Sequence, residues 1–300
     1  MGHSLTIAKT RFMLTGELEL DGFDSSFNPF LDTNSSFDLE CEIILKGADK
    51  EVSALPRLPD EPWSFRVNDD QCDIQRRNEA GETLWRVSAP SDFKKVTVSW
   101  NPSLFETYYH SYEKAWGTGL GLSFVILRLR ELGGLVFHGS ASVLDGHGIL
   151  CVGVSGQGKS TIANLFDAEG ATVLTDEHPV LRQEGLSQTT ATPPAKFRVY
   201  GSPWPSSSGF ASNENAPLKR IYFLEHGVDN QITRLSTKDA ISRLIHVAII
   251  PWQDPALFDP CLSTVEALLD SVPTAVLSFR PDQSVVDAIR QDLASERGLG

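Results

Sequence analysis

Apolar and polar residues alternate with a period of two in parts of the first 115 residues, which is the pattern of half-buried β-strands. The alternation is plain in Thr15–Leu20, Phe37–Leu45 and Val96–Trp100. A turn signal, Asp21-Gly22, follows the first of these stretches. Residues 1–115 are therefore predicted to form a β-rich N-terminal domain. Its acidic surface serves either solubility or the recognition of a peptide or protein acceptor.

The pattern changes near residue 115, where segments with the helical period begin to alternate with short apolar runs. An aromatic cluster marks the change and comprises Phe105, Tyr108, Tyr109, Tyr112 and Trp116. Strands are predicted at Gly139–Leu144, Ile149–Val152, Ala171–Leu174, Lys219–Leu224 and Ala275–Phe279. Helices are predicted at Leu122–Leu132, Lys238–Ile250, Leu262–Leu269 and Val285–Leu293. This mixture predicts a mixed α/β domain over residues 116–300.

A nucleotide motif lies within the second domain. Residues 153–161, Gly-Val-Ser-Gly-Gln-Gly-Lys-Ser-Thr, fit the phosphate-loop pattern G-x-x-x-x-G-K-[ST]. The predicted strand Ile149–Val152 precedes the motif, a helix is predicted from Thr161, and Gly170 is placed to end that helix. With glycine at about 7% of residues, an accidental match in a chain of this length occurs on the order of 1% of the time.

The chemistry of the motif follows from its residue types. Glycines let backbone N–H groups approach a phosphate, and the helix N-terminus adds the positive end of its dipole. Lys159 can reach the β- and γ-phosphates, and the Ser160 hydroxyl can bind Mg²⁺. The predicted nucleotide-binding residues are Gly153, Ser155, Gly156, Gln157, Gly158, Lys159, Ser160 and Thr161.

Two acids follow the next predicted strand. Asp176 and Glu177 stand at its carboxyl end, where ligands bind in open α/β sheets. The predicted metal ligands are Ser160, Asp176 and Glu177, and Asp176 is also the candidate for accepting the proton of an acceptor hydroxyl. The acids lie too close to the loop for an ABC-type ATPase. Lys159 occupies the phosphate-reading position and so excludes a dinucleotide fingerprint.

A long segment, Gly201–Pro217, is rich in glycine, serine, proline and asparagine and contains Trp204. Loops of this length in a compact domain are usually functional or lack regular structure. The sequence leaves open whether this one is an acceptor-binding lid or a mobile surface loop.

The bulk composition narrows the class of protein. A formal net charge of −13 argues against a nucleic-acid partner, which would select a basic face. The four cysteines are scattered without metal-ligand spacing, a pattern that suits a reducing cytoplasm. No signal peptide is expected, and the most hydrophobic run, Gly119–Leu132, is too short to span a membrane. A cytoplasmic protein without a membrane partner is expected.

The central block resembles the catalytic domain of HPr serine kinases. The shared features are a His-Gly strand, His138-Gly139-Ser140-Ala141, then a G-x-S-G-x-G-K-S loop, a short helix and an acidic pair. The block is also similar to ATP-dependent phosphoenolpyruvate carboxykinase, whose His-x-Ser-Ala strand, S-G-x-G-K-T loop and D-E-H run match the same region. A looser similarity to HPr-kinase-like proteins runs from Tyr200–Trp204 to the C-terminus.

The resemblance implies an HPr kinase/phosphoenolpyruvate carboxykinase-like fold that uses ATP and Mg²⁺, with Asp176, His138 and Lys159 as catalytic residues. A buried core histidine is the alternative for His138. The two families match Asp176 to different members of the acidic pair, so the roles of Asp176 and Glu177 stay open. Arg198–Gly201 is a remote counterpart of the arginine-glycine stretch that binds HPr. Related stand-alone kinases phosphorylate serine in peptide precursors, including lasso-peptide precursors.

Three functions are compatible with these features. The first is an ATP-dependent kinase that phosphorylates serine of a peptide or protein acceptor, with the nucleotide and this acceptor as partners and a homo-oligomer left open. The second is a small-molecule kinase that uses the same site. The third is a regulator that binds ATP without transferring phosphate and signals through residues 1–115.

Overall fold

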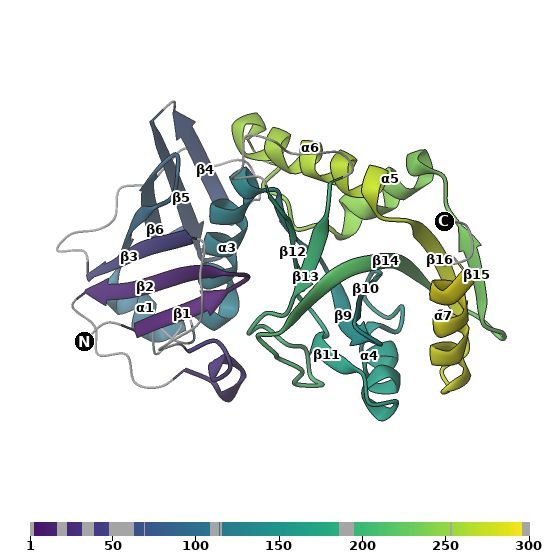
Figure 1. Ribbon diagram of the computed structural model, residues 1–300. Helices are drawn as coiled ribbons and strands as arrows, with labels where there is room; N and C mark the ends of the chain where they lie inside the picture. Colours follow the sequence, from purple (N-terminus) through teal and green to yellow (C-terminus); the bar gives the residue numbers. More distant parts are fainter. Residues whose placement is uncertain are drawn as a thin grey trace. The chain divides into compact units, whose positions relative to one another are not determined.

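The computed structural model describes residues 3–16, 23–31, 39–47, 63–68, 70–108, 114, 116–185, 195–252 and 254–295. The protein is mixed α/β and divides into two compact units (Figure 1). The first unit comprises Met1–Glu131 and Pro251–Asp259, and the second comprises Leu132–Ile250 and Pro260–Gly300. Within the described ranges, no helix combines the length and apolar character that a membrane crossing requires.

The first unit is built on a mixed seven-stranded sheet of order β1-β2-β3-β7-β6-β5-β4. The pairs β2–β3 and β3–β7 are parallel, and the other neighbours are antiparallel. Every second residue of β7 is buried, as the alternation of its sequence predicts. The strands are β1 (His3–Ile7), β2 (Thr10–Gly16), β3 (Leu39–Gly47), β4 (Trp63–Asn68), β5 (Gln71–Arg77), β6 (Thr83–Pro90) and β7 (Lys95–Trp100).

Two strands predicted for this region are confirmed, since Phe37–Leu45 overlaps β3 and Val96–Trp100 lies within β7. Thr15–Leu20 overlaps only the end of β2, and its remaining residues lie outside the described ranges. Tyr109 and Tyr112 of the predicted aromatic cluster also lie outside them. A role of this region in acceptor recognition stays a prediction.

The first unit also contains the helical segments η1 (Ser25–Phe27), α1 (Pro102–Tyr108), η2 (Trp116–Leu120) and α3 (Gly121–Leu129), and η3 (Arg130–Leu132) ends at the first residue of the second unit. Trp116 is buried, with its ring centroid 6.1 Å from that of Phe12 in β2 and 5.7 Å from that of Phe124 in α3. This aromatic packing joins α3 to the first sheet. The two units accordingly divide after Glu131, later in the chain than the predicted boundary near residue 115.

The second unit is built on a nine-stranded mixed sheet. Its main path runs β11-β9-β10-β14-β13-β12-β8, with β16 beside β14 and β15 beside β16. The strands are β8 (Gly134–Val136), β9 (Gly139–Leu144), β10 (His147–Val152), β11 (Thr172–Thr175), β12 (Val180–Gln183), β13 (Phe197–Tyr200), β14 (Asn215–His226), β15 (Gln231–Arg234) and β16 (Thr274–Phe279). The helices are α4 (Lys159–Ala168), α5 (Thr237–Val247), α6 (Pro255–Ser271), which begins in the first unit, and α7 (Ser284–Ser295).

Helices pack on both faces of this sheet, so its central strands are buried on both sides. Ile149 and Cys151 of β10 share a core with α4 and α7, whereas Leu150 and Val152 share a core with α5 and α6. A strand buried on both faces is apolar at every position, which explains the unbroken run in the sequence. All four cysteines are buried free thiols. Burial raises the pKa of the Cys151 thiol well above its usual range, as expected for an inert core cysteine.

Helix α5 ends at Val247, whereas the sequence predicts a helix up to Ile250. Ala248 instead pairs with Phe137, and the N–H of Ile249 donates to the carbonyl of Val136 at 2.8 Å. β-Branched residues directly before a proline disfavour the helical conformation. The predicted end of this helix is therefore wrong, and the chain there runs beside β8. The other strands and helices predicted for residues 116–300 all overlap observed ones.

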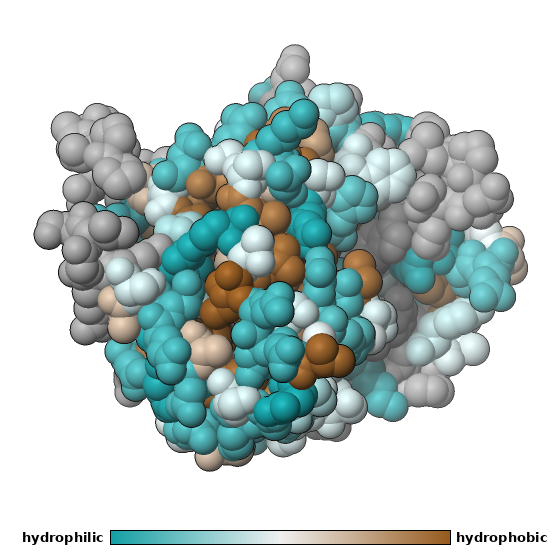
Figure 2. All heavy atoms as spheres, turned by 90° about the vertical axis from the view of Figure 1, so that its right-hand side faces the viewer, coloured by the Kyte–Doolittle hydropathy of each residue, from teal (hydrophilic) through white to brown (hydrophobic). Residues whose placement is uncertain are grey.

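The face shown in Figure 2 is mostly hydrophilic, with apolar residues in small groups among polar ones. Among the described residues, the exposed large apolar side chains are those of Leu31, Tyr108, Val154, Val228 and Trp252. Val154 belongs to the phosphate loop, where the backbone rather than the side chain is expected to meet a ligand.

Candidate functional site

The phosphate loop connects β10 to α4, as the sequence predicts. Gly156 and Gly158 have φ angles of 85° and 91°, which L-residues rarely adopt. A Cβ on Gly158 would also lie 2.9 Å from Cζ of Phe279 in β16, so a larger residue would be strained here twice over. The Lys159 ammonium donates to the carbonyl of Gly153 at 3.1 Å and therefore lies across the loop.

Two side chains support the loop rather than facing a ligand. The side-chain oxygen of Gln157 accepts the N–H of Val154 at 2.8 Å, which closes the loop on itself. On another side, Nε2 of His226 lies 2.8 Å from the carbonyl oxygen of Gly156. These contacts hold the loop backbone in a fixed shape, as preorganised phosphate binding requires.

A pocket of about 540 Å³ opens beside the loop. Seven of the eight predicted nucleotide-binding residues line it, all except Gln157. His138, Glu177, His246 and Val247 line it as well. Asp176 is not among the described lining residues, because its side chain is fully buried. The pocket therefore joins the loop to His138 and Glu177, and it leaves Asp176 beneath the surface.

The two acids point to different partners. The carboxylate of Asp176 accepts the backbone N–H of Ser206 at 3.0 Å and also accepts the hydroxyl of Ser206. The hydroxyl oxygen of Ser206 lies 3.2 Å from that of Ser160 in the phosphate loop. Glu177 is instead 3.5 Å from Nδ1 of His138, on the pocket side. Adjacent residues at the end of a strand project to opposite sides, which explains the separation.

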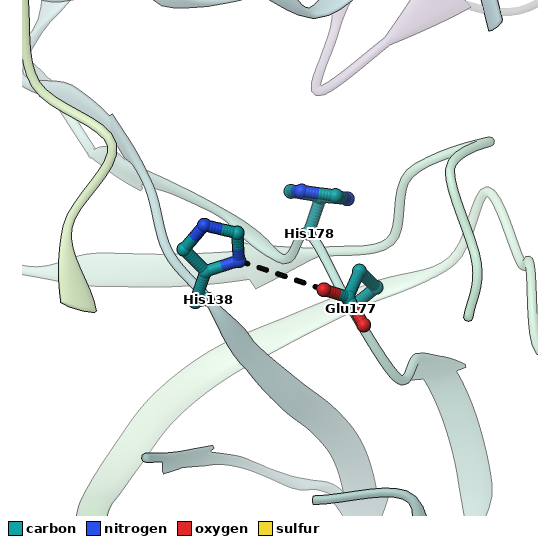
Figure 3. Close-up of side chains that lie close together, drawn as sticks. All are labelled: His138, Glu177 and His178. Atoms are coloured by element: carbon teal, nitrogen blue, oxygen red, sulfur yellow. Dashed lines mark ion pairs between the residues drawn. The ribbon is translucent and has the colours of Figure 1, made fainter. Parts of the chain in front are cut away.

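His138, Glu177 and His178 form a compact cluster (Figure 3), and their ligand atoms lie within 4.8 Å of one another. The two imidazole rings are 5.2 Å apart between centroids. Burial lowers the pKa of His178, with a smaller contribution from the nearby His138, so its imidazole is neutral near pH 7. Two imidazoles and a carboxylate can exchange protons with a bound molecule, and they are also a donor set that transition metals accept.

Backbone hydrogen bonds position this cluster. The N–H of His138 donates to the carbonyl of Val247 at 2.7 Å, and the N–H of Gly139 donates to the carbonyl of Glu177 at 3.1 Å. The start of β9 is thereby fixed between the end of α5 and the acidic pair. The side chain of His138 is half exposed and faces the pocket, which excludes the alternative of a buried core histidine.

Residues 201–214, a segment we call the β11 loop, pack along β11. The N–H of Ser212 donates to the carbonyl of Leu174 at 2.9 Å, and Ala211 forms a bridge with Thr175. The carbonyl oxygen of Trp204, whose side chain is buried, lies 3.2 Å from Nδ1 of His178. The observed loop is shorter than the predicted one, Gly201–Pro217, because β14 begins at Asn215. Whether it binds an acceptor stays a prediction.

Gly201 is expected to be essential to the shape of the β11 loop. A Cβ on Gly201 would lie 1.9 Å from the carbonyl oxygen of Ser212 and 2.6 Å from that of Leu174, both of which are backbone atoms. We expect Gly201→Ala to lower the free energy of unfolding by about 2–3 kcal/mol, measured by urea denaturation. The matched control is Ser207→Ala, an exposed position of the same loop, expected to stay within about 0.5 kcal/mol of wild type. Equal losses in the two variants would contradict the packing described.

Several residues of this site are missing from the sequence prediction, namely His178, Ser206, His226 and His246. A sequence signal did exist for His178, which is the histidine of the D-E-H run shared with the carboxykinases. The other three come from segments distant from the loop in sequence, and no motif marks them. The fold alone brings them there.

Comparisons with known proteins add little to this geometry. No protein-family model and no curated protein matches the chain. Among solved structures, the HPr(Ser) kinase/phosphatase from Coxiella burnetii aligns with 9% sequence identity over 54% of this chain and 98% of its own, with a TM-score of 0.31. A likeness at this level carries no argument about activity, so the interpretation of the site rests on its own residues.

Proposed function

We propose that this protein is an ATP- and Mg²⁺-dependent phosphotransferase whose acceptor is a serine hydroxyl of a peptide or protein. The observation that carries the proposal is the pocket itself, where a phosphate loop faces a histidine and a carboxylate at close range. The acceptor class follows the resemblance of the block from His138 to His178 to HPr serine kinases.

The residues of the site have separate roles in binding the phosphates and the cation. Amides of the loop and Lys159 bind the phosphates, which positions the γ-phosphate for transfer. The oxygens of Ser160 and Asp176 are hard donors of the kind that Mg²⁺ prefers, and they fit the cation better than the imidazole-rich cluster does. Mg²⁺ supplies charge neutralisation at the β- and γ-phosphates.

Glu177 is the better placed of the two acids for accepting the proton of the acceptor hydroxyl. A general base must come within hydrogen-bond reach of that hydroxyl, and Glu177 lines the pocket with His138 beside it. Asp176, the candidate favoured by the sequence, is covered by Ser206. We therefore assign Asp176 to the cation and Glu177 to the acceptor.

The direct test is incubation of wild type and Lys159→Ala with Mg·ATP and serine-bearing peptides, followed by mass spectrometry. Phosphate on a peptide serine with wild type, and none with the variant, supports the proposal. Phosphate found on a metabolite and never on a peptide would favour a small-molecule kinase. Tight ATP binding without transfer to any acceptor would favour a regulator.

A further inference from the structure

The hydroxyl of Ser206 lies between two groups proposed as metal ligands. Its oxygen is 3.2 Å from the hydroxyl oxygen of Ser160, and it donates a hydrogen bond to Oδ2 of Asp176. The backbone N–H of Ser206 donates to the other carboxylate oxygen at 3.0 Å. Oxygens from three separate segments of the chain thus meet beside the phosphate loop.

The chemistry of these oxygens and the spacing of the two hydroxyls suit a small divalent cation. Mg²⁺ binds six oxygens at about 2.0–2.1 Å in octahedral geometry, which places neighbouring ligand oxygens about 2.9 Å apart. The 3.2 Å between the hydroxyls of Ser160 and Ser206 is close to that distance. One carboxylate and two hydroxyls leave further positions for phosphate oxygens and water, the usual mode of Mg²⁺ binding with a nucleotide.

The position of Ser206 is built into the fold. The β11 loop is attached to the same strand that delivers Asp176, through the backbone hydrogen bond from Ser212 to Leu174. Ser206 is partly buried, whereas its neighbour Ser207 is exposed. Of the three consecutive serines, Ser206 is the one whose hydroxyl meets Asp176 and Ser160.

We infer that Ser206 is a third protein ligand of the divalent cation, contributed by the β11 loop; this inference rests on the proposed function. In this role, Ser206 exchanges its hydrogen bond to Asp176 for a bond to the cation, so that cation binding and the position of the β11 loop depend on each other. If Ser206 only satisfied a buried carboxylate, its replacement would change stability and leave the choice of metal unaltered.

The test is calorimetric titration of Mg²⁺ and Cd²⁺ into the full chain with a non-hydrolysable ATP analogue. We expect Ser206→Ala to weaken Mg²⁺ binding about 10-fold or more. Ser206→Cys is expected to weaken Mg²⁺ binding similarly but to bind Cd²⁺ more tightly than wild type, with an ultraviolet thiolate-to-cadmium absorption band, because thiolates select soft metals. Ser207→Cys is the control, and the native cysteines are all buried.

Three outcomes of these titrations test whether Ser206 is a ligand of the cation. The expected shifts in both Ser206 variants, absent from the control, support the assignment. Unchanged Mg²⁺ affinity in Ser206→Ala without a cadmium band in Ser206→Cys, while wild type binds the analogue, overturns the assignment and leaves the proposed function standing. A folded wild type that binds no nucleotide with either cation contradicts both. Thermal melting checks folding, and Ser206→Cys, which keeps a γ-atom in place of the hydroxyl oxygen, decides if the alanine variant does not fold.

Discussion

Glu177→Gln is expected to lower phosphoryl transfer by about 10²–10⁴-fold while Mg·ATP still binds. The substitution keeps the size of the side chain but removes the group that we propose accepts the proton. Glu177 lines the pocket and lies 3.5 Å from His138, whereas it makes no described contact with the side chain of Lys159 or Ser160. The effect should therefore fall on the chemical step, measured as single-turnover transfer to a peptide acceptor.

The variant Asp176→Asn distinguishes the role of Asp176 from that of Glu177. If Asp176 serves the cation, this variant needs more Mg²⁺ for half-maximal activity, and excess Mg²⁺ recovers part of the rate. Glu177→Gln should show no such recovery. The reverse pattern, with Asp176→Asn inactive at any Mg²⁺ concentration and Glu177→Gln nearly as active as wild type, would return the role of base to Asp176.

Asp292→Ala is expected to lower the free energy of unfolding by about 3–5 kcal/mol, because it removes a carboxylate that faces a fully buried guanidinium. Arg220 of β14 is fully buried, and its Nε lies 3.1 Å from the carboxylate of Asp292 in α7. The hydroxyl of Tyr222 donates to the same carboxylate at 2.7 Å, and Arg234 lies 3.0 Å from it. Asp292→Ala thus removes a carboxylate that three side chains of the sheet share.

The matched control for this prediction is Asp287→Ala on the same helix. Asp287 is largely exposed and lies 3.2 Å from Arg290, and exposed ion pairs of this kind contribute at most about 1 kcal/mol. Urea denaturation of both variants gives the comparison. Similar losses for Asp287→Ala and Asp292→Ala would mean that the buried network contributes no more than a surface pair.

The elements around the phosphate loop could be predicted from sequence because their signals are local. The strand before the loop, the motif of the loop and Gly170 after α4 can each be recognised from neighbouring residues, although Phe279 of β16 also limits the space at Gly158. The predicted strand Ile149–Val152 lies within β10, and β9 has the predicted bounds Gly139–Leu144. The end of α5 was missed because pairing beside β8, a long-range contact, takes precedence over the helical period there.

The site was only partly predictable for the same physical reason. The order Asp176-Glu177 identifies two acids at a strand end, but their partners depend on distant segments. The β11 loop covers one acid with Ser206, and the start of β9 brings His138 to the other. No local sequence pattern marks either of these contacts. The three-dimensional fold therefore decides which acid faces the pocket.

The most direct test of the central claim, a nucleotide site at residues 153–161, is calorimetric titration of Mg·ATP into wild type, Lys159→Ala and Lys238→Ala. Lys238 is an exposed lysine of α5, so its variant matches the change in charge. We expect wild type and Lys238→Ala to bind alike and Lys159→Ala to bind about 100-fold more weakly, since a hydrogen bond to a charged group contributes about 1.5–3 kcal/mol. A folded wild type that does not bind Mg·ATP, or a Lys159→Ala variant that binds it as tightly as wild type, would contradict the claim.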